Sequence, residues 1–278
     1  MVSGKKIGLG LVTCDRNDYL LQSLQSVLDN SRDLDCLIVC DDGASREKSS
    51  NIVNDLSKTF LSDNNDPYNI LYDQSPKPYS GVAHVKNRII STLMYRDCDY
   101  IFIMEDDMLL KNPEVFQAYI HAMEESGIHH MNFAKHGTAN YKHGFPTTRV
   151  TCAYNTFNIG FYPNLVGSFS VYTKECLDDI GMMDDKYINA MEHVDHTYMA
   201  SLKGYHPPFW WFPDLEHSLY YINEIEGSIS NTARSKNKLK NEINGMQRFE
   251  HKHGVHISRV PLPDQEEVIK FLKEKRLK

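Results

Sequence analysis

The chain has 278 residues, 41% of them apolar and 24% charged, a composition typical of a globular protein with a sizeable core. Its net charge of −7 and pI of about 6.0 argue against a general nucleic-acid binder. No apolar run approaches the roughly 18 to 20 residues that a membrane-spanning helix requires, so we expect no stable membrane span.

The N-terminal stretch MVSGKKIGLGLVTC places two lysines before an apolar segment, as signal peptides do. Because the segment is short, contains two glycines and runs directly into polar residues, a first β-strand is favoured. The six cysteines are scattered without a CxxC pair, and four of them lie in or beside predicted strands. We therefore expect reduced core thiols and a cytoplasmic protein.

Strand-like and helix-like segments alternate over the first 110 residues. Short apolar runs typical of strands lie at 6–14, 36–43, 68–74 and 99–107, and segments with apolar residues at helical spacing lie at 18–30, 49–61 and 81–95. This alternation predicts an α/β fold with a mostly parallel sheet covered by helices on both faces. Since ligands of such sheets bind beyond the carboxyl ends of the strands, one edge should carry the carboxylates Asp41, Asp42, Glu105, Asp106 and Asp107.

The rest of the chain is less regular. The patterns predict helices at 113–127, 174–181, 189–204 and 263–278, a short strand near 167–173, an aromatic stretch at 205–221 and a polar, basic tail at 230–254. We see no repeat and no low-complexity linker. We expect intimate lobes that share one core: a nucleotide-binding half at 1–110, an acceptor and catalytic half at 111–232, and a basic closing loop with a C-terminal helix at 233–278.

Three consecutive carboxylates, Glu105, Asp106 and Asp107, end the fourth predicted strand. Like charges at the end of a buried strand repel, and each is costly to desolvate. Solvated loop acids or helix N-caps, a carboxylate pair in acid/base catalysis, or a bound divalent ion would each make the run tolerable. The apolar residues on both sides favour the ion, and hard oxygen ligands suit Mg²⁺ or Mn²⁺.

Five segments, in this order, resemble the motifs of nucleotide-sugar glycosyltransferases with the GT-A fold. They are LVTCDRNDYLLQSLQSVL, IVCDDGAS, GVAHVKNRII, DYIFIMEDDMLLKNPEVF and IGMMDDKYINAMEHVDHTYMASLKGY. The most similar group is glycosyltransferase family 2, and the resemblance covers roughly residues 5 to 217. It implies a Rossmann-like sheet with an acceptor-side subdomain, a nucleoside-diphosphate sugar as donor, a divalent metal and inversion at the anomeric carbon.

The resemblance also implies roles for single residues. Asp107 matches the last acid of the family's DxD motif, which ligates the metal, and Glu105 replaces the usual first aspartate, which faces the ribose or the donor sugar. Asp42 would contact the nucleobase. The full set of implied donor-binding residues is Thr13, Asp15, Arg16, Asp41, Asp42, Lys86, Asn87, Glu105 and Asp106.

The segment AMEHVDHTYMASLKGY matches the helix that carries the general base of inverting members. His193 stands where the family usually has an aspartate, so we expect Glu192 to be the base, with Asp195 second. His193 is a third candidate because imidazoles titrate near neutral pH. A polar face of an amphipathic helix is one alternative, and zinc bound by His193 and His196 is another, although zinc helices space histidines by four, as in HExxH.

The aromatic stretch holds both tryptophans, Trp210 and Trp211, which would either pack in the core or stack on sugar rings. By resemblance, His217 would complete the metal shell. Three basic residues of the tail, Arg234, Lys236 and Lys238, would either close over the diphosphate or form a solvated loop.

These patterns predict a metal-dependent glycosyltransferase of hexosyl or N-acetylhexosaminyl type that uses Mn²⁺ or Mg²⁺ and a UDP-sugar. The acceptor class stays open among glycan, lipid-linked, protein and nucleobase hydroxyls. A nucleotidyltransferase is the rival enzyme, but the segment after the first strand, TCDRND, lacks the glycine-rich phosphate loop expected of one. A catalytically silent carbohydrate-binding protein is the rival outside the enzymes.

Overall fold

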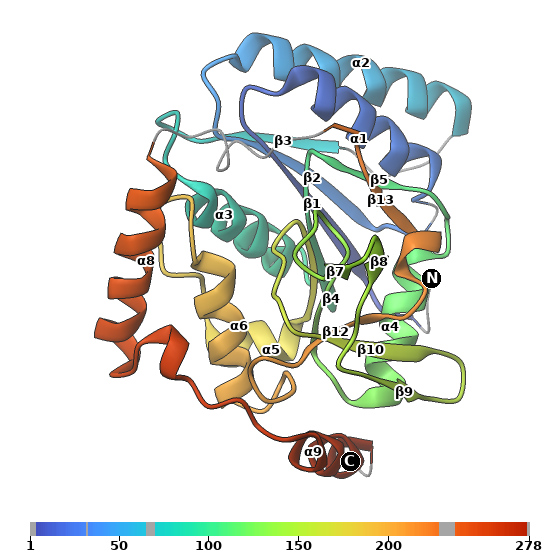
Figure 1. The fold of residues 1–278 in the computed structure, drawn as a ribbon. Coiled ribbons are helices and arrows are strands. Elements are labelled where there is room, and N and C mark those ends of the chain that lie inside the picture. The colour runs from blue at the N-terminus through green and yellow to red at the C-terminus, as the bar shows by residue number, and fades with distance from the viewer. Residues whose placement is uncertain (1–3, 32, 65–69, 228–236, 277–278) are drawn as a thin grey trace.

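The central sheet of the protein has six strands in the order β3-β2-β1-β4-β11-β6 (Figure 1). The computed structural model describes residues 4–31, 33–64, 70–227 and 237–276. The first four strands pair in parallel, whereas β11 runs antiparallel to both of its neighbours. The strands are β1 (Ile7–Thr13), β2 (Cys36–Asp41), β3 (Ile70–Gln74), β4 (Tyr100–Glu105), β6 (His130–Asn132) and β11 (Phe169–Thr173). The predicted mostly parallel sheet is confirmed.

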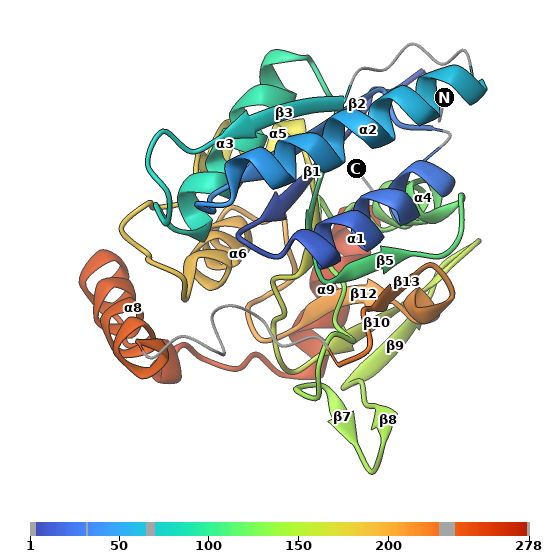
Figure 2. The same cartoon turned by 90° about the horizontal axis from the view of Figure 1, so that it is seen from above.

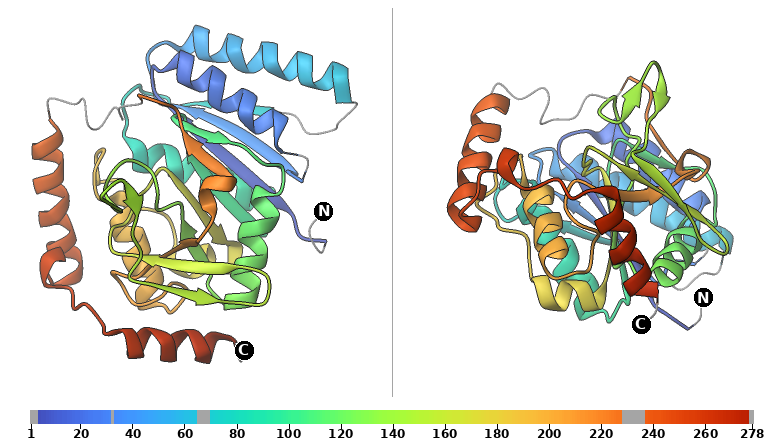
Figure 3. Two further views of the ribbon diagram at one scale, coloured as in Figure 1. Left: turned by 45° about the vertical axis from the view of Figure 1, so that its right-hand side comes forward. Right: turned by 60° about the horizontal axis from the view of Figure 1, so that its bottom comes forward.

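Helices cover both faces of this sheet (Figures 2 and 3). One apolar core joins one face to α1 (Asn17–Asp29), α2 (Arg46–Asn64) and α4 (Val115–Ser126). A second core joins the opposite face to α3 (Val82–Tyr95), α5 (Lys174–Ile180) and α6 (Glu192–Leu202). The sheet is therefore buried on both sides, which explains why its strands read as nearly continuous apolar runs.

The strand register sets the position of the acidic edge. In β1, Thr13 pairs with Asp41 of β2, and Val12 pairs with Glu105 of β4. The carboxyl ends of β1, β2 and β4 consequently lie at the same level, so the residues that follow these strands converge although they are far apart in the sequence.

Smaller sheets of two or three strands lie beside the central sheet (Figure 1). β10 (Asn158–Tyr162) pairs with β9 (Val150–Ala153) and β12 (Phe212–Leu215), β5 (Met108–Leu110) pairs with β13 (Ile222–Glu224), and β7 (Tyr141–Lys142) forms a hairpin with β8 (Phe145–Pro146). Because β6 and β11 complete the main sheet, the parts expected at 1–110 and 111–232 share one sheet.

The polar tail, which we expected to be a closing loop, contains the helix α8 (Lys238–His253). We did not predict this helix because the segment is strongly polar overall, and only Gly245 and Phe249 of α8 are fully buried. At Gly245 the helix backbone approaches Met191 so closely that an added Cβ would lie 2.7 Å from Met191 Cγ. The predicted lid residues Arg234 and Lys236 lie outside the described residues.

The predicted C-terminal helix is present as α9 (Gln265–Arg276), which buries Val268 and Leu272 in the core that α4 shares. Two short 3-10 turns, η1 (Ser218–Tyr220) and η2 (Ile257–Arg259), complete the fold. Within the described part of the chain, no helix combines the length and apolar character needed to cross a bilayer.

Candidate active site

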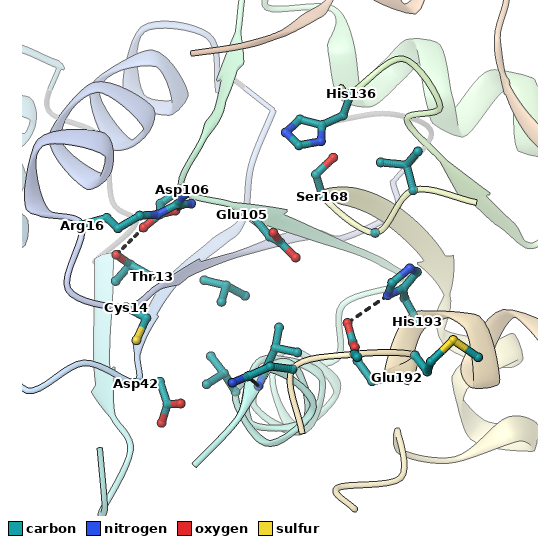
Figure 4. A pocket seen from close by; sticks show the side chains of 18 of the residues that line it. Thr13, Cys14, Arg16, Asp42, Glu105, Asp106, His136, Ser168, Glu192 and His193 are labelled. Atoms are coloured by element: carbon teal, nitrogen blue, oxygen red, sulfur yellow. Dashed lines mark hydrogen bonds and ion pairs between the residues drawn. The ribbon is translucent and has the colours of Figure 1, made fainter. Parts of the chain in front are cut away.

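A pocket of about 690 Å³ opens at the carboxyl edge of the central sheet, and its volume is in the range of small-molecule sites. Figure 4 shows two groups of polar side chains facing each other across it. Thr13, Arg16 and Asp106 lie on the wall formed by the ends of β1 and β4. Glu192 and His193, from the first turn of α6, lie on the opposite wall.

Asp106 is held by the chain itself. Thr13 Oγ1 donates a hydrogen bond of 2.7 Å to Asp106 Oδ2, and Arg16 forms an ion pair with Asp106 Oδ1. Arg16 also lies 3.2 Å from Asp107 Oδ2. Burial raises the pKa of Asp106 to about 6, against the opposing effect of Arg16 and Thr13. An internal cation therefore relieves part of the repulsion within the acidic run.

Asp107 keeps one carboxylate oxygen for a further ligand. Its side chain is fully buried, and its Oδ1 has no hydrogen-bond partner among the described residues. His136 Nε2, equally without one, lies 3.8 Å from that oxygen and 3.5 Å from Glu224 Oε2. Two ligands of one small divalent ion stand roughly 3 to 4 Å apart, because each metal bond is about 2.0 to 2.2 Å long. Asp107 and His136 therefore fit a divalent ion.

A buried network fixes the segment that carries His136. Lys135 Nζ donates to Leu215 O at 3.1 Å and to Ser218 Oγ at 2.9 Å. Ser218 Oγ in turn donates to Asp214 Oδ2 at 2.7 Å, and that oxygen also accepts from the backbone N–H of Ala134. The loop after β6 is thereby bound to the end of β12, and His136 is held toward the acidic edge.

The structure places His217, the predicted metal ligand, outside the residues that line the pocket. Its side chain is 82% exposed, and its Nε2 lies 3.6 Å from Glu216 Oε2. The histidine that lies beside Asp107 is His136 instead. No sequence motif singles out His136, and the only signal for it is the high content of His and Asn in residues 129–170.

The far end of the pocket is built around Asp15, Asp42 and Tyr79. Both oxygens of Asp42 accept backbone N–H groups, from Ser80 at 2.9 Å and Gly81 at 2.8 Å, and so shape the turn before α3. Tyr79 OH donates to Asp15 Oδ2 at 2.5 Å, and Tyr79 as a whole residue is 61% exposed. This exposed ring was not predicted, and it is well placed for a planar ligand group.

Asp41 and Cys14 are less available to a ligand than Asp15 and Asp42. Asp41 Oδ1 accepts from the Gly43 N–H at 2.7 Å, and its Oδ2 accepts from Tyr72 OH at 3.0 Å, so this carboxylate stabilises the end of β2. Cys14 lines the pocket, but burial and the nearby Asp42 raise the pKa of its thiol to about 12. At neutral pH Cys14 is therefore a protonated thiol rather than a nucleophile.

Lys86 connects the two walls of the pocket. Its buried ammonium donates to Glu105 Oε1 at 3.1 Å, to Glu192 Oε1 at 3.2 Å and to Gly167 O at 3.1 Å. Burial alone would lower the pKa of Lys86, but the two glutamates raise it above its ordinary value. Asn87 instead exchanges two 2.8 Å hydrogen bonds with the backbone of Met183 and anchors that loop.

The three candidate bases of α6 have different environments. Glu192 and His193 line the pocket, and His193 Nδ1 lies 3.0 Å from Glu192 Oε1. Asp195 is absent from the pocket lining and binds α8 instead, through Lys252 Nζ at 2.6 Å and His253 Nε2 at 2.7 Å. The structure therefore brings two of the three candidates together at the site and uses the third to dock a helix.

Neither tryptophan is among the lining residues of the pocket. Trp210 Nε1 donates to Val260 O and Trp211 Nε1 donates to Pro263 O, both at 3.0 Å. His196, the other half of the zinc alternative, is buried against Tyr172 and Gly181, away from His193. In the part of the chain that the structure describes, no three His, Cys, Asp or Glu side chains form a ready-made metal set.

No family model and no curated protein matches the sequence. Several solved structures do match the fold of the chain. GalNAc-T7 with UDP, GalNAc and Mn²⁺ superposes with a TM-score of 0.60 at 11% identity over 98% of this chain. S. aureus TarS 1-349 in complex with UDP superposes with a TM-score of 0.56 at 12% identity over 97% of this chain. The protein has the GT-A fold.

This confirms the fold expected from the ordered motifs. The chain spans 54% of the GalNAc-T7 chain and 70% of the TarS 1-349 chain. It also superposes on the longer S. aureus TarS structure with a TM-score of 0.57 at 12% identity, over 97% of this chain and 42% of that chain. The GT-A chain described here is thus substantially shorter than these proteins.

Proposed function

We propose that this GT-A protein is a glycosyltransferase that moves a sugar from a nucleoside diphosphate, first of all UDP, to an acceptor hydroxyl. The observation that carries the proposal is one pocket with the acidic edge on one wall and the Glu192–His193 pair on the other. A donor bound between them would have its diphosphate near the acids and its anomeric carbon toward the pair. The UDP complexes of TarS and GalNAc-T7, which share the fold, support the choice of nucleotide.

Asp107 and His136 would hold the divalent ion, Mn²⁺ or Mg²⁺, which supplies positive charge next to the leaving diphosphate. Arg16 keeps Asp106 and Asp107 in position. The exposed ring of Tyr79 would stack on the nucleobase, with Asp15 and Asp42 beside it.

Glu105 and Lys86 would bind the donor sugar side of the site. Lys86 keeps the Glu105 carboxylate oriented, and about a quarter of the Glu105 side chain is exposed to the pocket. The acceptor oxygen would form a bond to the anomeric carbon while the bond to the diphosphate breaks. A direct displacement of this kind inverts the anomeric centre.

Donor turnover tests the proposal. Purified protein with Mn²⁺ should release UDP from one of UDP-glucose, UDP-galactose, UDP-N-acetylglucosamine and UDP-N-acetylgalactosamine, slowly with water alone and faster with the right acceptor. The Asp107→Asn variant should lose Mn²⁺ binding, measured by titration calorimetry, and roughly 100-fold or more in rate. Asp97→Asn, at an exposed carboxylate between α3 and β4, is the matched control and should behave as wild type.

Other outcomes would identify the rival functions. Binding of UDP-sugars without any release of UDP, with every acceptor class present, would indicate a carbohydrate-binding protein. Release of pyrophosphate from a nucleoside triphosphate would indicate a nucleotidyltransferase. Full activity of Asp107→Asn would show that the ion is not held at this carboxylate.

A further inference from the structure

His193 occupies the site with a fixed tautomer. A carboxylate can only accept hydrogen bonds, so the 3.0 Å contact between His193 Nδ1 and Glu192 Oε1 requires the proton on Nδ1. In the neutral imidazole, the other ring nitrogen, Nε2, then carries a lone pair. No described residue bonds Nε2, and His193 lines the pocket. The ring therefore presents an acceptor nitrogen where a substrate hydroxyl can reach it.

Glu192 is poorly suited to be the base itself. It is buried and lies within 3.2 Å of the Lys86 ammonium as well as beside the imidazole. Although burial opposes the effect, His193 and Lys86 hold the pKa of Glu192 well below its usual range. A carboxylate that stays ionised and hydrogen-bonded orients a neighbour well but accepts a proton poorly.

Close packing holds the imidazole in place. A Cβ added at Gly167 would lie 2.7 Å from His193 Cγ, so only a glycine leaves room for the ring beside this loop. The same Gly167 carbonyl accepts from Lys86, which fixes the loop to the Lys86–Glu192 pair. The ring, its carboxylate and the loop beneath it form one rigid unit.

We propose that His193 Nε2 is the general base of this transferase and that Glu192 is its positioning residue. The inference rests on the proposed function and specifies how the acceptor is activated. The acceptor O–H bond breaks and its proton passes to Nε2, while the acceptor oxygen bonds to the anomeric carbon. The bond between that carbon and the diphosphate oxygen breaks, and the electron pair leaves with the nucleoside diphosphate. The imidazolium, stabilised by Glu192, later returns its proton to water.

The charged groups around His193 come from four elements. They are Glu192 on its own helix, Lys86 on α3, Glu105 on β4 and Glu242 on α8, whereas Asp195 lies on the side of α6 that contacts α8 and binds Lys252 and His253. Lys86 is shared between Glu105 and Glu192. A substitution at either glutamate therefore changes the charge around the carboxylate position that contacts the His193 ring. The pH dependence of turnover should therefore respond to Glu192 as well as to His193.

The pH profile of kcat/KM tests the proposal on the UDP-sugar that wild type turns over most rapidly with Mn²⁺. For an imidazole base the rate rises with pH as the ring loses its proton. His193→Gln should lose about 100- to 10,000-fold in kcat/KM. His193→Asp should keep part of the activity and move the rise to roughly pH 4 to 5, the range of carboxylates.

Glu192→Gln distinguishes positioning from general support of the fold. It should lower kcat by roughly tenfold or more with little change in KM, and move the rise in rate to lower pH, because the imidazolium loses its negative partner. UDP–Mn²⁺ binding, measured by calorimetry, should be unchanged in all three variants. His251→Gln, at an exposed position of α8, is the matched control and should keep both the rate and the profile.

Each outcome decides a different question. If wild type turns over a UDP-sugar and His193→Gln keeps more than a tenth of kcat/KM, or the His193→Asp profile rises over the wild-type range, His193 is not the base, although the proposed function stands. If wild type turns over no donor, the proposed function fails and the assignment of a base fails with it. Should a His193 variant lose UDP–Mn²⁺ binding through misfolding, the Glu192→Gln profile decides, and an unchanged pH range would overturn the proposal.

Discussion

At the scale of single residues, two carboxylates three positions apart on one helix have separate tasks. Glu192 faces the pocket and pairs with Lys86 and His193. Asp195 lies on the side of α6 that contacts α8, where Lys252 and His253 bind it. Their spacing in the sequence would allow both carboxylates to lie on one face of the helix. The residues that bind them show that they serve different parts of the molecule.

The Asp195→Asn substitution tests this separation. It removes the charge that faces Lys252 and His253, so we expect the free energy of unfolding to fall by about 3 kcal/mol, measured in urea. Asp184→Asn breaks the ion pair with Arg248 of α8 at a more exposed position. It should therefore lower the free energy of unfolding by less than Asp195→Asn does. The pH range over which kcat/KM rises should be unchanged, and a shift of that range in Asp195→Asn would return Asp195 to the catalytic residues.

At the scale of elements, the close approach of α3 to β1 positions the centre of the site. A Cβ at Gly10 would lie 2.0 Å from Ile89 Cγ2, and one at Gly8 would lie 2.8 Å from Leu93 Cδ2. Two glycines in β1 thus let α3 lie directly on the sheet. Lys86 is one helical turn from Ile89, so this packing determines how far the ammonium reaches toward Glu105 and Glu192.

Gly10→Ala should therefore lower both stability and rate. We expect a loss of about 1 to 3 kcal/mol in the free energy of unfolding, because α3 must shift or Ile89 must leave its rotamer. Ile89→Ala in the same chain removes the obstructing methyl groups and should recover part of the loss, as a double-mutant cycle. Simple additivity of the two substitutions would contradict the contact.

At the scale of the whole molecule, three buried histidines make folding sensitive to acid. Burial lowers the pKa of His196 to about 4 and that of His206 to about 3, and holds that of His130 well below its ordinary value. The unfolded chain binds protons on these rings near pH 6.5, so it holds more protons than the folded chain below that pH. Their contribution to stability is fully present above pH 6.5 and is lost as the pH falls.

Urea unfolding at pH 7 and pH 5 measures this loss. For each of these buried histidines, the free energy of unfolding should be about 2 kcal/mol lower at pH 5 than at pH 7. His206→Asn keeps a donor for Pro207 O but removes the titrating ring, so its stability should fall less steeply with acid. The comparison cancels the contribution of the carboxylates, and an equally steep fall in His206→Asn would exclude His206 as a source.

Much of the fold could be predicted from the sequence because it depends on local patterns. Apolar runs of strand length that alternate with helical spacing predicted the parallel sheet and its helices, and the carboxylates at the ends of β2 and β4 marked the edge at which the pocket opens. The α8 helix escaped prediction because its segment is strongly polar overall, and only two of its residues are fully buried.

Only the tertiary structure decided which residues meet at the edge. His136 reaches Asp107 through a buried network that joins β6 to β12, whereas His217, which the motif order favoured, is exposed. The tryptophans donate to backbone carbonyls of the C-terminal segment rather than facing the pocket. Contacts of this kind depend on long-range packing, which a linear pattern does not contain. The sequence by itself determined the fold and the acidic edge of its sheet. Tertiary packing determined which side chains lie next to those acids.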